Sequence, residues 1–438
     1  MIDKYYNGVI EQVYNHVGTT EKNIVMANYN NDFSIKNLET VKRYRAQMDS
    51  VFFASREFGY RELTGAYEPF LDTICDMFRA YGTGDFDAFL DGCGVYELHK
   101  EILRSYYESG ICKRNENVLL NEVAYEQDRM TDAMAAMLKA LAKEHPLMLV
   151  INRFQMASRS TFELVHDLIA HPDKNIGLVL GVNDSVGRKE SVADVWDRIV
   201  ESLKDRSQLY HIGSSDHRRT EIAREHVLGE GYTDNVDVDE DYEASIQKVS
   251  NIVEFLDYDQ AKRYFREVEY QIKFEDARMK NASRRAFYLL YAKTSILLGE
   301  LSKALELLTE AKNLIPAEYE FKYRAELDFL RGTCYMYQGK LDRAERYADQ
   351  SYTWGVESGD ERAVFRAELL KVMAQMSGWY NIFFCVKDIP IEPELIEKLI
   401  QYDYQNHLAH IYIYAYDNQP NVVAKAYRSE AALFYFSK

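Results

Sequence analysis

Short runs of consecutive apolar residues recur through the first half of the chain and predict buried β-strands. The clearest pair is Leu147–Ile151 and Ile176–Val182. Continuous apolar runs of this length are typical of parallel strands that are covered on both faces. Between them, about Ser160–Ala170 is expected to be a helix. A strand, a crossover helix and a second strand form a βαβ unit, which predicts a doubly wound parallel sheet.

The same pattern predicts three further strands and several helices. The strands are Asn23–Ala27, Ser50–Ser55 and Gln208–Ser214. Helices are expected over residues 1–20, from about Ser34 to Met48, over 70–81, 95–109 and 118–144, and over Asp216–Leu228. The GTGD and DGCG sequences are interpreted as breaks between helices.

Beyond about residue 245 the pattern changes to one of helical repeats. Gly299 and Ala304 recur as Gly339 and Ala344, and Ala261 fits an earlier copy. Small residues at these places let paired helices approach closely, while large apolar residues fill the groove between pairs. The pattern predicts stacked helix pairs through the rest of the chain.

Composition narrows the class of protein. A chain of 438 residues is long enough for two or three domains. With 70 acidic against 53 basic residues, the net charge of −17 argues against wholesale binding of nucleic acid. The five cysteines form no CxxC pair, which fits buried thiols in a reducing compartment. We find neither a signal-peptide core nor an apolar run of the roughly 18 residues that a membrane span needs, and expect a cytoplasmic protein.

The chain resembles the signal-transduction ATPases (STAND), an AAA-like family with the P-loop NTPase fold that carries tetratricopeptide-type (TPR) repeats. The resemblance rests on the repeats and on three stretches of the first half, namely the strand that ends at Asn152-Arg153, the strand that ends at Asn183-Asp184, and the run Tyr67-x-Pro69-Phe70. It implies an AAA-like domain at 1–229, an acidic linker at 230–244 and a TPR-like helical superhelix at 245–438.

The nucleotide motifs of that family are degenerate in this chain. Its phosphate loop, GxxxxGK[ST], uses glycine amides and a lysine to hold phosphate, but residues 28–34 contain neither residue type. Where the family has paired acids that hold magnesium, this chain has Asn152 and Arg153, and the arginine would oppose a metal ion. The resemblance therefore implies a vestigial nucleotide pocket without catalytic residues or a metal. Its residues are Asn28, Tyr29, Asn31, Asp32, Ser34, Asn152, Arg153 and Asp184. ATP or ADP is not an expected cofactor, although Arg153 can pair with a phosphate-bearing anion.

Several polar residues have both a structural and a functional interpretation. Ser34 can supply a magnesium-binding hydroxyl or cap a helix, as can Asp32, and the cap is favoured because Ser and Asp lead at that position. Asp184 can report nucleotide state or close a turn, and the turn is favoured. Ser158 and Ser160 are interpreted as turn and cap residues rather than nucleophiles. The basic cluster Lys42-Arg43-Tyr44-Arg45 is expected to be a solvated face, with a partner-binding patch as the alternative.

The acidic stretch Glu230–Glu243 places Asp237, Asp239 and Asp241 at the spacing of an EF-hand loop. Tyr242 stands where that loop requires glycine, and Lys248 stands where it requires glutamate. A solvated linker is therefore expected there rather than a calcium site.

These observations favour a non-catalytic regulatory protein of signal transduction whose TPR arm binds a protein or peptide partner. One alternative is the N-terminal sensor portion of a helix-turn-helix transcription regulator or signalling cyclase, so nucleic acid is expected only through an effector outside these residues. Another is an ATP-dependent switch with an atypical phosphate loop. The apolar Ala431–Phe436 is expected to be covered by further sequence or by a second copy in a homo-oligomer.

Overall fold

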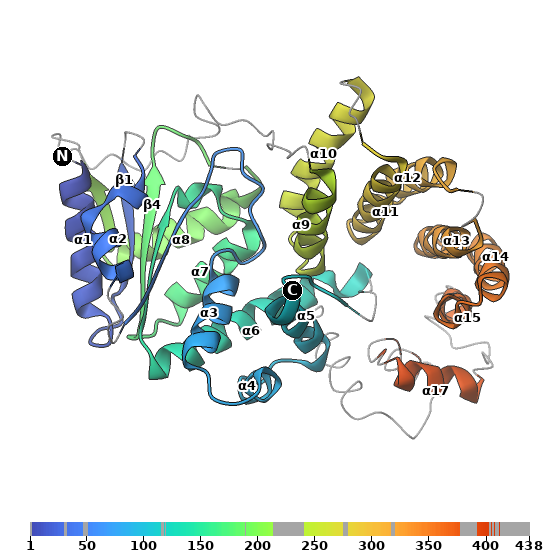
Figure 1. Ribbon diagram of the computed structural model, residues 1–438, viewed down its shortest axis with the longest axis horizontal. Coiled ribbons are helices and arrows are strands. Elements are labelled where there is room, and N and C mark those ends of the chain that lie inside the picture. Colours follow the sequence, from blue (N-terminus) through green and yellow to red (C-terminus); the bar gives the residue numbers. More distant parts are fainter. Residues whose placement is uncertain are drawn as a thin grey trace. The chain divides into compact units, whose positions relative to one another are not determined.

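A computed structural model of the chain contains two compact units (Figure 1). The α/β unit comprises Met1–Cys112, Gln127–Glu240 and Gln247–Tyr270, and the helical unit comprises Lys113–Glu126, Asp241–Ile246 and Gln271–Lys438. The structure describes residues 2–29, 33–46, 51–114, 118, 120–188, 190–212, 241–274, 279–316, 320–376, 392–402, 404, 407 and 411.

Within the described residues, the α/β unit contains a five-stranded sheet in the order β2-β3-β4-β1-β5. Every neighbouring pair is parallel, which confirms the predicted parallel sheet. Every residue of β3 and β4 is buried, as their continuous apolar sequences predict. The strands are β1 Ile24–Tyr29, β2 Phe52–Glu57, β3 Leu147–Asn152, β4 Ile176–Asn183 and β5 Leu209–Ile212.

One face of the sheet is covered by α1 (Ile2–His16) and α2 (Glu39–Ala46), at the left of Figure 1. Because side chains alternate along a strand, Val25, Ala27 and Tyr29 of β1 all pack on this side. Gly177 of β4 allows the close approach of α1, since a Cβ there would lie 2.5 Å from Val17 Cγ2.

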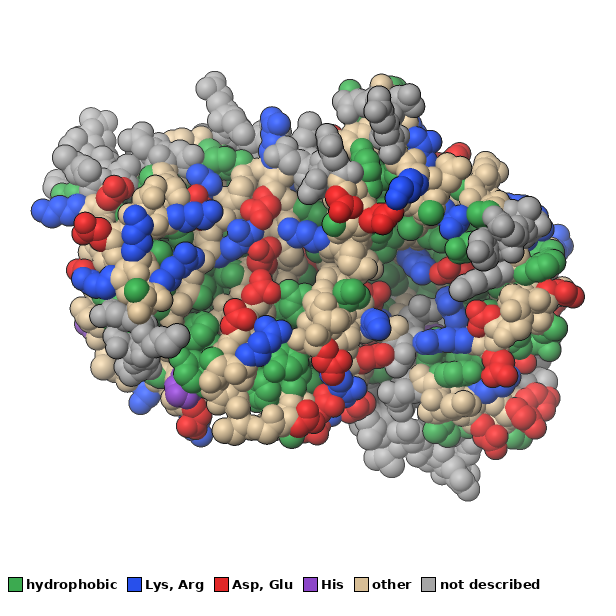
Figure 2. Space-filling view, viewed as in Figure 1, with side chains coloured by type: hydrophobic (Ala, Val, Ile, Leu, Met, Phe, Trp, Pro, Cys, Tyr) green, Lys and Arg blue, Asp and Glu red, His purple; other side chains and the backbone are tan. Residues whose placement is uncertain are grey.

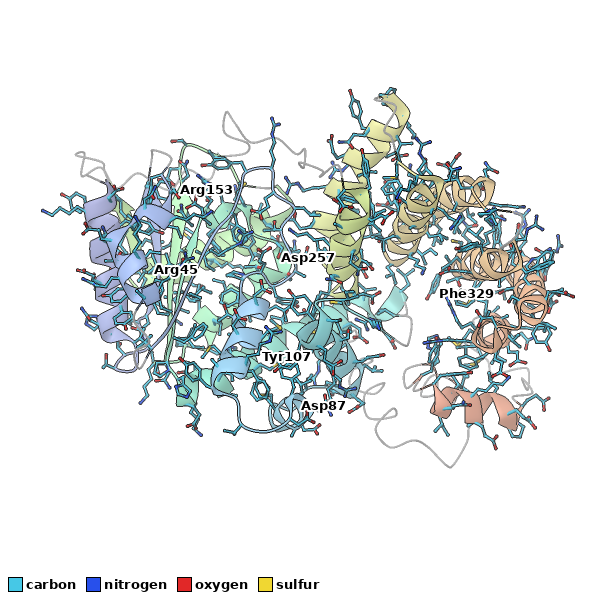
Figure 3. The ribbon with its side chains drawn as sticks, viewed as in Figure 1. Arg45, Asp87, Tyr107, Arg153, Asp257 and Phe329 are labelled. Carbon is cyan, nitrogen blue, oxygen red and sulfur yellow. The ribbon has the colours of Figure 1, made fainter. Side chains whose placement is uncertain are left out.

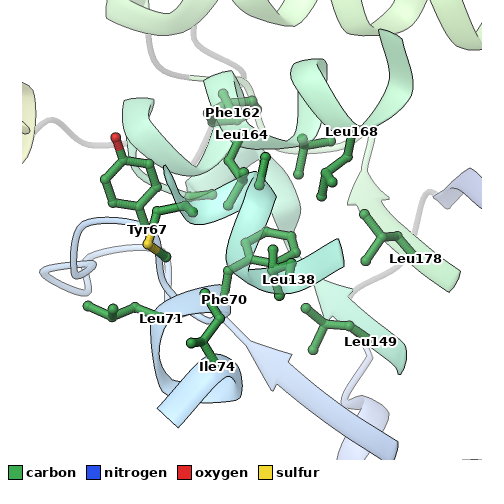
Figure 4. Packing of buried hydrophobic residues seen from close by; sticks show 14 of the residues in the cluster. Tyr67, Phe70, Leu71, Ile74, Leu138, Leu149, Phe162, Leu164, Leu168 and Leu178 are labelled. Atoms are coloured by element: carbon green, nitrogen blue, oxygen red, sulfur yellow. The ribbon is translucent and has the colours of Figure 1, made fainter. Parts of the chain in front are cut away.

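The opposite face is covered by α3, α6, α7 and α8, and its core includes Phe70, Leu138, Leu149 and Leu178 (Figure 4). The remaining helices before residue 240 are α3 Phe70–Tyr81, α4 Phe86–Gly92, α5 Glu97–Ser109, α6 Val123–Glu144, α7 Arg159–Ala170 and α8 Ala193–Asp205, with short 3-10 turns η1 Ile35–Asn37, η3 Phe154–Met156 and η4 Glu190–Val192. A further 3-10 turn, η2 Leu120–Glu122, belongs to the helical unit.

Most predicted elements are confirmed within a few residues, and two differ in an instructive way. The GTGD sequence does break the chain, but α4 begins directly after it, at Phe86, because Phe86 and Leu90 bury one side of this short helix. The strand predicted at Ser50–Ser55 extends to Glu57. The predicted helix at Asp216–Leu228 and the aspartates at 237 and 239 lie outside the described residues.

Beyond residue 240 the described chain is entirely helical in its regular elements, which confirms the predicted change of architecture. Helices α11 to α15 pack in succession, each against the next (Figure 1). None of the helices in the described ranges is long and apolar enough to cross a membrane. The helices are α9 Tyr242–Glu254, α10 Tyr258–Phe274, α11 Asn281–Leu297, α12 Leu301–Asn313, α13 Glu320–Tyr337, α14 Leu341–Ser358, α15 Glu361–Met376 and α17 Pro393–Gln401.

The sequence recurrence corresponds to a recurring turn between helices. Gly299 and Gly339 follow α11 and α13 with φ angles of +73° and +70°. In both turns the residue after the glycine donates its N–H to a carbonyl five residues back, as in a Schellman motif. Leu256 has the same hydrogen bonds and a φ of +62° between α9 and α10, so the earlier copy carries leucine in place of glycine.

The first helix pair belongs largely to the α/β unit, because Gln247–Tyr270 groups with it. Asp257, labelled in Figure 3, accepts hydrogen bonds from Ser160 N (3.0 Å) and Ser160 Oγ (2.6 Å) at the start of α7. The Phe255 ring packs edge-on against Tyr67 at 6.0 Å. These contacts attach the turn between α9 and α10 to the sheet's helical layer, and the domain limits at 229 and 245 stay predictions.

Candidate functional site

The candidate site lies at the carboxyl ends of β1 and β4, where the direction of the chain diverges. The connection that leaves β1 runs through α2 on one face of the sheet, whereas the connection that leaves β4 runs through α8 on the other. In open parallel sheets such a point forms a crevice, and ligands bind there. Tyr29 and Asn183 are paired in register at this edge, and Asp184 N donates to Tyr29 O at 2.8 Å.

Aromatic rings and one amide fill the α1 side of this edge. The Tyr29 hydroxyl donates to Asn152 Oδ1 at 2.7 Å, and Asn152 Nδ2 donates to the Phe33 carbonyl at 3.2 Å. The Tyr29 and Phe33 rings meet edge-on at 4.6 Å, and the Tyr6 ring meets Phe33 at 5.1 Å. Tyr6, Tyr29 and Asn152 are fully buried. This part of the edge is therefore packed with protein atoms.

Gly181 of β4 is the residue that lets these groups meet. A Cβ at this position would overlap the Tyr6 hydroxyl and lie 2.7 Å from Asn152 Oδ1. The bond from Tyr29 on β1 to Asn152 on β3 therefore passes over the glycine of the strand between them. Burial, and after it the charge of Glu57, raises the pKa of the Tyr6 phenol far above its ordinary value, so this hydroxyl stays neutral.

A carboxylate of the protein itself, that of Glu57 at the end of β2, lies next to this cluster. Its Oε2 accepts hydrogen bonds from Ser34 Oγ at 3.0 Å and from the Ile35 backbone N–H at 2.8 Å. Ser34 does precede the 3-10 turn as predicted, but its side chain makes no capping bond. Ser34 therefore occupies the cap position, but its side chain does not cap the turn as predicted, because the hydroxyl donates to Glu57 instead.

Arg153 completes this cluster, and Figure 3 shows it at this edge of the sheet. Its Nη1 lies 3.4 Å from Glu57 Oε1 and donates to the Phe58 carbonyl at 3.1 Å. Its guanidinium lies 4.7 Å from the centre of the Tyr60 ring. The side chains of Arg153 and Glu57 are only 15% and 10% exposed. The backbone of Arg153 is left-handed, with a φ of +53°, a conformation that costs energy in a residue other than glycine.

The other residues of the predicted nucleotide pocket do not all face the cluster around Glu57. Asn28 is buried on the face opposite Tyr29, as strand alternation requires. In the turn after β4, Asn183 Oδ1 accepts from Ser185 N at 3.0 Å, and the turn role expected of Asp184 stays a prediction. Asn31 and Asp32 lie outside the described residues.

Ser158 caps α7, as predicted, because its Oγ accepts the Thr161 N–H. Ser160 has a different role from the predicted one, since it donates to Asp257. In the basic cluster of α2, Arg43 pairs with Glu11 at 2.8 Å and Arg45 donates to the Ser55 carbonyl at 3.0 Å. Lys and Arg side chains gather over α1 and α2 in Figure 2. Two of the three cations in this cluster thus have partners within the protein.

Sequence reasoning missed Glu57, Tyr6 and Tyr60. Glu57 falls outside the predicted strand, which ends two residues too early, at Ser55, although an acid at the end of a half-buried strand is a usable signal. Tyr60 accepts from Asn183 Nδ2 at 2.8 Å, a contact between distant parts of the chain that no local pattern reveals.

The Glu57 carboxylate is held between the Arg153 guanidinium, the Ser34 hydroxyl and the backbone N–H of the next residue. The anion bound at this edge is therefore a side chain of the protein itself. In the described part of the chain, no group of three or more His, Cys, Asp or Glu side chains is placed to hold a metal ion. Comparisons with protein-family models, with curated proteins and with solved structures give no match.

Proposed function

We propose that this chain is a regulatory protein of the STAND type that does not hydrolyse nucleotide, because its own Glu57 carboxylate occupies the phosphate position. The observation that carries this proposal is the pair of bonds that Glu57 accepts from Ser34 Oγ and Ile35 N. In P-loop proteins, phosphate oxygens accept hydrogen bonds from the same kinds of donor at the segment that follows the first strand. An anion cannot bind to these donors while the carboxylate holds them.

The packing around Glu57 supports the same proposal. Phosphoryl transfer depends on a positioned metal ion, a lysine and backbone amides. Here the charge of Arg153 is already paired with Glu57, and the Tyr6, Tyr29 and Phe33 rings occupy the adjacent space. Loss of a single electrostatic catalytic group typically lowers a reaction rate by about a hundredfold or more. This chain lacks the glycines and the lysine of the phosphate loop as well as the paired acids that hold magnesium.

The helical unit is proposed to be a TPR-type arm that binds a protein or peptide partner. Support comes from the repeated helix pairs, in which Ala304 and Ala344 are fully buried directly after the two glycine turns. Stacked pairs of this kind build extended surfaces that take peptide segments. The AAA-like assignment of the α/β unit rests on its parallel sheet and on the strand-edge residues named above.

The test is calorimetry and phosphate release with the full chain, ATP and magnesium. We expect no heat of binding for ATP or ADP at the strand edge and no phosphate release above buffer. Arg153→Asp should not create turnover, because the lysine and glycines are still missing. Hydrolysis that Ser34→Ala abolishes, and that the matched Ser55→Ala on β2 leaves intact, would contradict the proposal.

A further inference from the structure

The turn between α9 and α10 holds a second group of buried polar contacts in the α/β unit. We name residues 255–257 the docking turn, because they pack on the helical layer that covers one face of the sheet. The Phe255 ring lies edge-on to Tyr67 at 6.0 Å and to Tyr106 at 6.1 Å. Only 3% of this phenylalanine is exposed, so burial of its ring favours the docked position.

Asp257 of the docking turn is a buried carboxylate without a cation. It is 4% exposed, and within the described part of the chain it forms no ion pair. Its Oδ2 accepts from Ser160 N at 3.0 Å and from Ser160 Oγ at 2.6 Å, whereas its Oδ1 accepts no hydrogen bond from any described residue (Figure 3). The positive end of α7 thus takes the place of a counter-ion. A buried acceptor without a partner costs free energy, and this cost is relieved when water reaches it.

The backbone on both sides of this contact is strained. Leu256 in the docking turn and Tyr67, against which the turn packs, have φ angles of +62° and +54°. Neither residue is glycine, so this left-handed conformation is unfavourable and persists only where surrounding contacts hold it. When the docking turn leaves those contacts, Leu256 can return to an ordinary conformation. Undocking therefore releases strain at the same time as it hydrates Asp257.

Further polar contacts fasten the same region. About one helical turn before the docking turn, Asn251 of α9 accepts from Cys112 N at 2.9 Å and donates to the Gly110 carbonyl at 2.7 Å. Gln127 of α6 donates to the Leu256 carbonyl at 2.7 Å. When such bonds open, water replaces the lost partner, so each contributes only a small net stabilisation. These bonds therefore fix the position of the turn more than they stabilise it.

We propose that the docking turn is a releasable joint, at which residues 247–270 leave the helical layer as one body while the sheet stays folded. Burial of Phe255 favours the docked state, whereas the unpartnered oxygen of Asp257 and the strained backbone of Leu256 favour release. Contributions that oppose one another in this way leave a small free-energy gap between two states. A gap of this kind is the property of an element that switches between two positions.

The test is amide hydrogen exchange of the full chain, resolved at single residues. The Ser160 N–H lies in the first turn of α7, where no carbonyl of the helix can accept it, so its acceptor is Asp257. The Cys112 N–H donates to Asn251. Relative to their intrinsic rates, both amides should exchange at least about tenfold faster than the Leu178 amide, which donates to a backbone carbonyl next to β1.

Asp257→Ala shows whether the contacts open together. The Ser160 N–H then has no acceptor in the docked state, so the variant should raise the exchange rate of the remote Cys112 amide roughly tenfold and leave Leu178 unchanged. Asn251→Ala is the reciprocal variant and should accelerate Ser160, and it decides the matter if Asp257→Ala does not fold. The matched control is Asp205→Ala at the exposed end of α8, which should leave every one of these amides unchanged.

Equal protection of Ser160, Cys112 and Leu178 in the wild type would overturn this proposal, because the turn would then open only with the whole unit. Acceleration of Ser160 alone in Asp257→Ala would also contradict it, since the effect would be local. The same holds if Asp257→Ala accelerates Leu178 as much as Cys112, because the contact would then stabilise the whole unit rather than a joint.

Discussion

The strand edge of the α/β unit and the surroundings of Asp328 in the helical unit both bring arginine and carboxylate side chains together, yet protein atoms fill the space around the first cluster and leave a pocket beside the second. At the strand edge, Glu57 is matched to Arg153, to Ser34 Oγ and to the Ile35 N–H, and aromatic rings fill the remaining volume. In the helical unit, Asp328 pairs with Arg331, and both residues help to line a pocket of about 280 Å³. The same residue types therefore build a closed core in one unit and an open pocket in the other.

An arginine in the sequence therefore indicates a ligand site only once its partners within the protein are known. Arg153 is the more conspicuous residue in the sequence, because it stands where the ATPases that the chain resembles carry an acid. Arg331 and Arg324 lie in a single helix, α13, and no sequence motif distinguishes them.

Two buried cysteines allow the units to be monitored independently. Burial raises the pKa of the Cys75 thiol in α3 to about 12, and that of the Cys334 thiol in α13 to about 12. Thiols in this state react with alkylating reagents only when their surroundings open. Labelling of Cys75 and Cys334 along a urea series, measured by mass spectrometry, therefore reports the stability of the α/β and helical units in turn.

The largest effect is expected for Glu57→Gln. The substitution leaves Arg153, which is mostly buried, without its counter-charge, so the α/β unit should lose about 2–3 kcal/mol of unfolding free energy. The matched control is Glu11→Gln, because Glu11 and its partner Arg43 are 45% and 50% exposed and solvent screens their ion pair, which should contribute little to the unfolding free energy. If Cys75 becomes labelled at the wild-type urea concentration in both variants, the ion pair of Glu57 with Arg153 does not stabilise the strand edge.

Gly181→Ala should destabilise the α/β unit by about 2 kcal/mol, since the new methyl group overlaps the Tyr6 hydroxyl and approaches Asn152. Tyr6→Phe alone should be close to neutral, because among the described residues the buried hydroxyl has no hydrogen-bond partner to lose. In that background Gly181→Ala should cost less. The control is Gly8→Ala in α1, where a Cβ meets nothing within 4 Å and helix propensity predicts a gain of roughly 0.5–1 kcal/mol. Equal effects of the two glycine variants would contradict the close packing over β4.

Gly339→Ala should destabilise the helical unit by about 1–2 kcal/mol. There is open space for a Cβ, so the cost comes from placing alanine at a φ of +70° rather than from a clash. Gly92→Ala is the control, because a Cβ there also meets nothing within 4 Å and the residue ends a helix with an ordinary φ. The readout is the urea concentration at which Cys334 becomes labelled for Gly339→Ala, and at which Cys75 becomes labelled for the control in the α/β unit. An unchanged midpoint would show that the turn after α13 is not under conformational strain.

The smallest effect concerns pH. Because burial raises the folded-state pKa of Asp328, the folded helical unit binds more protons than the unfolded chain between the ordinary and the raised pKa. Its unfolding free energy should therefore fall slightly as the pH rises through that window, because the hydrogen bond from Trp354 and the attraction of Arg331, Lys312 and Arg324 oppose the effect of burial. Asp328→Asn should remove this dependence while keeping the bond from Trp354. A helical unit whose Cys334 labelling midpoint rises with pH over the same range would contradict the expected direction.

Much of the architecture was predictable because local patterns carry it. The continuous apolar runs at Leu147–Ile151 and Ile176–Val182 predict two of the central strands of the sheet, and the Gly299 and Gly339 recurrence predicts the helix pairs. The third turn of this kind was harder to recognise, since Leu256 adopts the left-handed conformation without being glycine. Its conformation is imposed by the docking of Phe255 and Asp257, which are distant in sequence from their partners Tyr67 and Ser160.

The sequence by itself determined the elements, the parallel sheet and the absence of a phosphate-loop motif between Asn28 and Ser34, because hydrophobic periodicity and residue type act over a few neighbouring positions. Only the tertiary structure decided which charges meet. Glu57 and Ser34 are brought together by the crossover through α2, and Arg153 reaches Glu57 because β3 lies beside β2 in the sheet. Lys312 joins Arg331 because α12 packs against α13. Coulomb energies depend on these distances, which residue spacing along the chain does not contain.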